Sequence, residues 1–159
     1  MFCLPESLKV VQGLALEGAG AGANSLPVSL KTVSGKLYIM VSVYRAGGAA
    51  MVLTPQTDTL VAFGSAAGLA SAVRIWANET TGTTDLLVEQ TAAVAFTTTA
   101  DVNPKLVIFE IDPADLTAGE DCVRLAITNV PNADSVAVIY VYEPRYASRV
   151  STQPTAITD

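Results

Sequence analysis

Histidine is absent from this 159-residue chain. Without histidine, the chain lacks the usual general base for a serine or cysteine nucleophile and the commonest transition-metal ligand. Neither a P-loop nor a glycine-rich dinucleotide-binding motif occurs. A hydrolase is therefore disfavoured, and the sequence predicts a protein that is not an enzyme, with no catalytic residues, no cofactor and no metal site.

Positive charge is scarce, because 9 Lys and Arg residues face 15 Asp and Glu residues and leave a net charge of −6. The phosphates of DNA or RNA would repel such a chain, so we expect no nucleic-acid binding. The carboxylates are densest at Asp112, Asp115, Glu120 and Asp121, but their spacing does not match a calcium-binding loop. Helix capping explains part of this cluster, since Asp112 suits the N-cap and Pro113 the first helical position.

Long apolar runs are also missing. The longest are strand-length and far short of the roughly 20 residues that a membrane span requires, so we predict no membrane role. Pro5, Glu6 and Lys9 interrupt what would be the apolar part of a secretion signal, which predicts a chain made and kept in a cytoplasm. Cys3 and Cys122 are the only cysteines, and a reducing compartment favours packed thiols over a disulfide.

Apolar residues, by contrast, are abundant. Half of the residues are hydrophobic and 15% are charged, where about 25% is usual for soluble domains. So few charges are typical of a subunit that faces other subunits, although an alanine-rich monomer would give the same composition. The length suits a single domain with one core.

Short strands with a two-residue period recur along the chain. The clearest are 37–44, 105–111, 123–127 and 136–142, and weaker ones are expected at 8–16, 26–32, 50–54, 60–63, 73–77, 86–89 and 93–96. Turn residues separate them, and no segment is long enough for a major helix. The sequence therefore predicts an all-β fold, a single-domain antiparallel β-sandwich or jelly-roll-like barrel with an extended N-terminal arm.

Two hairpins are expected within this pattern. Gly47 and Gly48 would turn strand 37–44 into strand 50–54, with the pairing interrupted at 55–58. Strands 86–89 and 93–96 would form the second hairpin.

The two ends of the chain differ in composition from its middle. We predict an N-terminal arm and Gly/Ala-rich hinge at 1–24, a β-sandwich domain at 25–147 and a C-terminal tail at 148–159. Neither end has enough apolar pattern to fold alone, so both are expected to dock on neighbouring subunits. An arm that adds a strand to a sheet edge would insert alternate side chains into apolar pockets, here Leu8, Val10 and Leu14.

The strand at 136–142 is apolar on both faces. Ala137, Ile139 and Val141 share one face, whereas Val136, Val138, Tyr140 and Tyr142 share the other. A single core covers only one of these faces, which predicts a homo-dimer or homo-trimer. Tyr140 and Tyr142 are accordingly candidate partner-binding residues.

Several motifs together resemble a family of small tailed-bacteriophage proteins associated with the phage head. The motifs are SLKVVQGLAL, PVSLKTVSGKLYIMVSVYRAGG, AVRIWANETTGTTDLLVEQT, VIFEIDPADLTAGEDCVRLAI and VYEPRYAS, in this order. Residues 110–112 and 121–124 match the family's EID and DCVR signature, and residues 144–147 match its terminal PRYA. Arg145 and Tyr146 of that last motif join the candidate partner-binding residues.

The resemblance implies a capsid decoration or cement protein. Such a protein binds the major capsid protein lattice and stabilises the phage head. It would be made in the host bacterial cytoplasm and reside on the capsid surface of the virion. The resemblance supplies no catalytic residues.

An alternative function is a carbohydrate-binding or host-adhesion module displayed on the virion. Trp76, the only tryptophan, stands beside Arg74 on a predicted strand and could stack a sugar together with Tyr38 and Tyr44. A structural tryptophan that closes the edge of a sandwich is the simpler interpretation.

Overall fold

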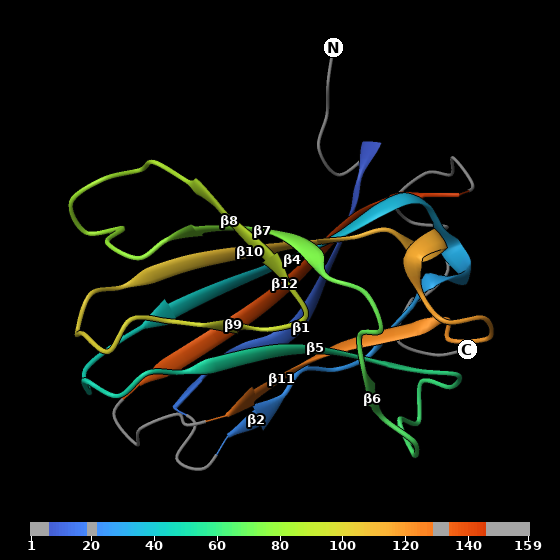
Figure 1. Cartoon of the computed structure of the whole chain (residues 1–159), viewed down its shortest axis with the longest axis horizontal. Coiled ribbons are helices and arrows are strands. Elements are labelled where there is room, and N and C mark those ends of the chain that lie inside the picture. The colour runs from blue at the N-terminus through green and yellow to red at the C-terminus, as the bar shows by residue number, and fades with distance from the viewer. Residues whose placement is uncertain (1–6, 19–21, 129–133, 146–159) are drawn as a thin grey trace.

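Two antiparallel β-sheets carry nearly all the regular structure of the computed structural model, which describes residues 7–18, 22–128 and 134–145 (Figure 1). Sheet A has the order β1 (Lys9–Gly18), β12 (Ser135–Pro144), β4 (Val33–Tyr44), β10 (Lys105–Ile111), β7 (Val73–Asn78) and β8 (Val88–Ala93). Sheet B has the order β2 (Ala23–Asn24), β11 (Cys122–Thr128), β5 (Val52–Asp58) and β6 (Ala67–Gly68), while β3 (Val28–Ser29) also pairs with β11 and β9 (Phe96–Thr97) with β5. The fold is an all-β sandwich, as predicted, and not a closed barrel.

The core lies between the two sheets and follows the expected two-residue period. Sheet A contributes the inward residues of β4, β10 and β12, and sheet B those of β11. The buried set includes Leu37, Ile39, Val41, Val43, Val107, Phe109, Ile111, Val123, Leu125, Ile127, Val136, Val138, Tyr140 and Tyr142. Burying each large apolar side chain favours folding by about 1.5–3 kcal/mol.

Both predicted hairpins are wrong. β4 pairs with β12 and β10 in sheet A, whereas β5 pairs with β11 in sheet B. Likewise β8 pairs with β7 in sheet A, while β9 pairs with β5 in sheet B. In both cases the chain crosses between the sheets. Val43 of β4 and Leu53 of β5 are buried in the core from opposite sides, and Ala93 of β8 and Phe96 of β9 are partly buried against it.

Pro55 does not interrupt β5, contrary to the expectation. It stands opposite Leu125 of β11, and on the other side of β5 the pairing with β9 ends at Leu53 while that with β6 begins at Gln56. A residue without an N–H group is tolerated at such a gap in the ladder. The strand expected at 60–63 is instead a turn in which Phe63 has a φ of 50°.

Two short 3-10 helices cap strand ends. Residues Pro113–Asp115 form the helical turn that was predicted, and the Asp112 side chain accepts a hydrogen bond from the N–H of Ala114 at its start. The other, Leu30–Thr32, replaces the last three residues of the strand expected at 26–32, of which only Val28–Ser29 is a strand, and leads directly into β4.

The segment 1–24 contributes strands to both sheets. β1 pairs with β12 at the edge of sheet A, and β2 pairs with β11 in sheet B. Val11 and Leu14 of β1 are buried in the core of this chain. The described part of the arm therefore lies within the sandwich.

Candidate functional surface

The outward face of sheet A carries an apolar surface that the pairing registers define residue by residue. Ile139 of β12 stands opposite Met40 of β4, which stands opposite Ile108 of β10, which in turn stands opposite Trp76 of β7. We call this row the apolar row. Next to this row, Tyr38 of β4 stands opposite Val141 of β12. On the other side of the row, Ser42 of β4 stands between Leu106 of β10 and Ala137 of β12.

These side chains are accessible. Ile139 is 40% exposed, and Met40, Ile108 and Trp76 are half-buried by their neighbours in the same face. Because the row crosses four neighbouring strands of sheet A, it extends over about 15 Å at 4.7–4.9 Å per strand. Contiguous apolar surface of this kind on a sheet is a candidate for contact with another surface.

Charged side chains border the apolar row on one side. The Glu110 carboxylate, itself buried, pairs with the ammonium of Lys36 and lies 3.8 Å from the guanidinium of Arg74. Arg74 also bonds Glu89 across β7 and β8 at 3.0 Å. The hydrogen bond from Lys36 to Glu110 raises the pKa of Lys36, and the bond to Glu89 raises the pKa of Arg74. Both shifts favour the positively charged forms of Lys36 and Arg74.

The three aromatic residues considered for sugar binding do not converge. Arg74 lies over the Trp76 ring at 4.6 Å from its centroid and occupies one of its faces. Tyr38 belongs to β4, and β10 separates that strand from the β7 strand of Trp76. Tyr44, at the end of β4, is six residues or about 20 Å along the strand from Tyr38. No shared stacking platform results.

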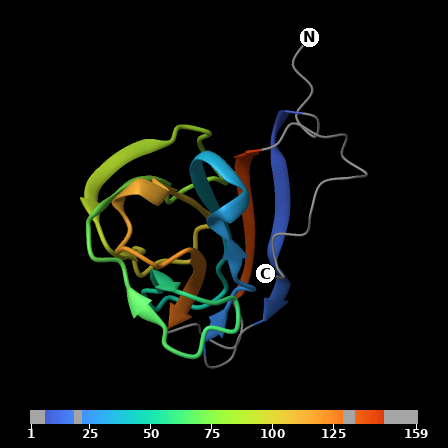
Figure 2. The same ribbon diagram turned by 90° about the vertical axis from the view of Figure 1, so that its right-hand side faces the viewer.

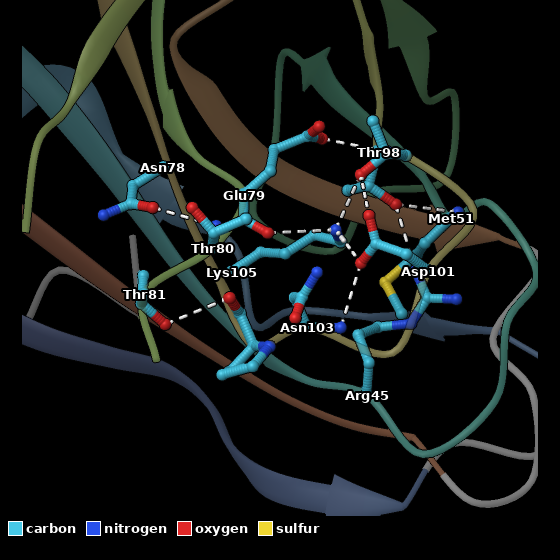
Figure 3. Close-up of polar contacts among 12 residues, drawn as sticks. Arg45, Met51, Asn78, Glu79, Thr80, Thr81, Thr98, Asp101, Asn103 and Lys105 are labelled. Atoms are coloured by element: carbon cyan, nitrogen blue, oxygen red, sulfur yellow. Dashed lines mark hydrogen bonds and ion pairs between the residues drawn. The ribbon is translucent and has the colours of Figure 1, made fainter. Parts of the chain in front are cut away.

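A polar network holds the loops at one end of the sandwich (Figure 3). The Lys105 ammonium, on a fully buried side chain, lies 2.7 Å from both the Asp101 carboxylate and the Thr99 hydroxyl, and 3.3 Å from the Glu79 carbonyl. The N–H of Thr99 donates to the Glu79 carboxylate. Since its donors are directed to these acceptors, Lys105 fixes the loops around β10 and is not presented to a substrate.

A second buried pair, Arg45 and Asp134, connects the loop after β4 to the start of β12. The two charged groups are 2.7 Å apart and both side chains are fully buried. Asp134 also accepts hydrogen bonds from the N–H groups of Ala46 and Gly47. Arg45 donates a hydrogen bond to the Thr98 hydroxyl (Figure 3). These bonds satisfy charges that would otherwise be costly to bury.

Two open clefts flank the connection between β7 and β8. One has a volume of about 520 Å³ and the other about 290 Å³. Both include Asn78 and Thr84, whose polar groups are engaged within the protein: the Asn78 amide donates to the Thr84 carbonyl, and the Thr84 hydroxyl accepts from Leu86. The hydroxyls of Thr81 and Thr83 likewise donate to backbone carbonyls. The clefts therefore present few uncommitted donors.

The predicted partner-binding residues fall into three groups. Leu14, Tyr140 and Tyr142 are buried in the core, where the Tyr140 hydroxyl donates to the Leu26 carbonyl. Val10 and Arg145 are exposed and Leu8 is half-buried. Tyr146 lies outside the described residues, as do Cys3 and the tail 148–159, whereas Cys122 is a buried thiol.

The structure thus brings forward residues that the sequence reasoning did not select. Met40, Ile108 and Leu106 are not among the predicted partner-binding residues, because the two-residue period alone does not show that a second face of these strands is accessible. The available signal was that β10, like 136–142, is apolar on both faces. Tyr140 and Tyr142 were placed on the wrong side of their strand, because alternation alone does not tell which face is inward.

Within the described ranges, no group of three or more cysteine, aspartate or glutamate side chains is arranged to hold a metal ion. No helix among these residues is long and apolar enough to cross a membrane.

The fold and this surface define an all-β sandwich protein with one accessible apolar sheet face. No protein-family model matches the chain, and no curated protein matches it. Its structure is similar to that of the SPBc2 prophage-derived protein YomS, with 11% sequence identity, a TM-score of 0.46, and coverage of 85% of this chain and 91% of that one. Weaker likenesses are to a structure described as "CBM4 structure and function" (11% identity, TM-score 0.30, coverage 89% and 88%) and to Desmodium yellow mottle tymovirus (12%, 0.20, 89% and 82%).

Proposed function

We propose that this chain is a non-enzymatic structural protein of a phage virion that decorates the capsid, binding the major capsid protein lattice and stabilising the head. The sequence motifs described above support this class of protein. The observation that carries the proposal is the apolar row on sheet A, an accessible sheet face of a kind suited to another protein surface.

The arrangement fits a cement role physically. A sandwich held by buried pairs such as Arg45 and Asp134 presents the apolar row on the four central strands of the six-stranded sheet A, so little conformational entropy is lost when the face is covered. The charged border of Lys36, Glu110, Arg74 and Glu89 would surround the contact with polar groups, as at other interfaces with an apolar centre and polar rim.

A binding assay tests this proposal. Purified wild-type protein is mixed with empty expanded capsids of the phage that encodes it, and both the bound protein and the temperature of capsid rupture are measured. We expect saturable binding and a higher rupture temperature. Failure of the wild type to bind, or binding without any change in rupture, would contradict the cement function.

Two matched variants locate the contact. Ile139→Lys places a charge in the apolar row and should weaken binding at least tenfold. Leu60→Lys, at an exposed leucine in the turn after β5, should bind like the wild type. If the wild type binds and both variants bind equally well, the capsid contact lies elsewhere on the molecule.

A further inference from the structure

Strand β8 lies at the edge of sheet A opposite β1 (Figure 2). Among the described residues it pairs with β7 alone. The backbone groups on its other side therefore have no strand partner among these residues and can pair with another strand. The Val88 carbonyl accepts a hydrogen bond from the Gln90 side chain, which would have to give way if that carbonyl joins the new ladder. At the opposite edge, β1 pairs with β12 through a ladder that shifts register twice.

Exposed apolar side chains gather around β8 more densely than elsewhere in the described chain. Leu86 and Leu87 precede the strand, Val88 begins it and Val94 follows it, and they are 64%, 38%, 50% and 43% exposed. The strand lacks the lysine or proline that commonly protects a sheet edge. In fact neither Lys nor Arg occurs anywhere between Arg74 and Lys105.

The charges at this edge form a self-complementary arrangement. Glu89 stands opposite Trp76, so it shares the outward face of sheet A with Arg74, which it bonds. Val73 pairs with Ala93 and Ile75 with Gln90, so Arg74 faces two residues of β8, Thr91 and Ala92. The guanidinium lies over the Trp76 ring and bonds Glu89. The Ala92 side chain is small and exposed, so it places no bulky group between Arg74 and the edge of the sheet.

We propose that β8 pairs antiparallel with β8 of a second copy of this chain, about a two-fold axis near Gln90 and Thr91, so that sheet A continues across the dimer. In this register Val88 is opposite Ala93 of the second copy, and Leu87 is opposite its Val94. The exposed apolar residues of each copy are thus covered by those of the other. This inference goes beyond the proposed function and does not depend on it.

The same register matches the charges. Glu89 of the second copy stands opposite Ala92, two strand spacings or about 10 Å from Arg74. An arginine side chain spans much of that distance, and its five donors serve both its own glutamate and that of the second copy. By the two-fold symmetry this contact occurs twice, and no two like charges stand directly opposite each other.

Sedimentation velocity of the full chain over a concentration series tests the dimer. We expect a monomer–dimer equilibrium for the wild type, with a dissociation constant raised at least tenfold by Leu87→Lys or Val94→Lys. Leu60→Lys, at an exposed leucine in the turn after β5, is the matched control and should dimerise like the wild type. Near-ultraviolet circular dichroism confirms that each variant is folded.

Cysteine cross-linking tests the register. A mixture of Glu89→Cys and Ala92→Cys proteins should form a disulfide-linked dimer, because these positions are opposite each other. Either variant alone should cross-link much less, since two copies of position 89 are about three residues apart along the strand, beyond the usual reach of a disulfide.

Three results would overturn the proposal. The first is a monomer at every concentration up to a few hundred micromolar. The second is a dimer that Leu87→Lys leaves intact while Ile139→Lys dissociates it, which would place self-association on the apolar row. The third is equal cross-linking in the mixed and unmixed cysteine variants.

Discussion

Gly13 of β1 lies directly against the ring of Tyr140, one of the largest side chains buried in the core. A Cβ atom at Gly13 would stand 2.3 Å from Cε2 and 2.9 Å from Cδ2 of that ring. The ring has little freedom to move, because the Tyr140 hydroxyl bonds both Ser25 and the Leu26 carbonyl. At this residue the absence of a side chain is therefore a packing requirement.

Gly13→Ala should consequently destabilise the protein by about 1–3 kcal/mol, the usual cost of overpacking a core. Gly35→Ala is the matched control, since no atom outside its immediate neighbours lies within 4 Å of a Cβ there, and its effect should be within about 0.5 kcal/mol. The free energy of unfolding in urea measures both. Equal stability of the two variants would show that β1 does not pack on Tyr140 in this way.

At the scale of elements, β1 is the segment whose role changes most between sequence and structure. Its alternate side chains were expected to enter pockets of a neighbouring subunit, and the structure directs Leu14 into the core of the same chain. Its pairing with β12 also covers the edge of the most apolar strand in the protein. β1 thus stabilises the sandwich itself.

Two leucines of β1 make this testable. Leu14→Ala removes a buried side chain and should lower the free energy of unfolding of the isolated protein by about 2–5 kcal/mol. Leu16→Ala, two residues along and 69% exposed, should change it by less than about 0.5 kcal/mol. If thermal and urea unfolding cannot distinguish the variants, β1 is a docking arm and not a strand of this sheet.

Among the elements, strand existence could be predicted and strand pairing could not. The sequence predicts strands at 37–44, 105–111 and 123–127, because inward apolar residues recur there at every second position. Pairing depends on which sheet a strand joins, and the strand's own residues do not specify this. The glycines at 47 and 48 are compatible both with a hairpin and with a crossing between the sheets. The buried contacts of Arg45 with Asp134 and Thr98 hold that loop in its crossing between the sheets, and they join residues far apart in sequence.

For the whole molecule, we expect stability to be nearly constant around neutral pH and to fall at both extremes, since the chain has no histidine. Backbone N–H groups of Ser65, Thr59 and Leu60 lower the pKa of Asp58, and Lys105 lowers the pKa of Asp101. The unfolded chain then binds protons more readily than the folded one below about pH 4, so acid reduces the free energy of unfolding.

The alkaline side follows from the opposite shift. Burial raises the pKa of Tyr140 and of Tyr142, so the unfolded chain loses these protons first and the free energy of unfolding decreases above about pH 10. Urea unfolding at a series of pH values measures both limbs. Asp58→Asn should make the acid limb shallower, with the contribution of Asp101 remaining, and leave the alkaline limb unchanged. A marked step between pH 6 and 8 would contradict this account.

The all-β class, the absence of histidine chemistry and the capped turn at Asp112 and Pro113 were determined by the sequence alone, because each depends on residue type and on spacing within a few positions. Tertiary structure decided which face of 136–142 is inward, that β1 belongs to the sandwich, and that Ile139, Met40, Ile108 and Trp76 meet in one row. The alternation of side chains along a strand defines two faces, but it does not show which of them is inward. Only the packing of the second sheet against one face leaves the other accessible to a partner.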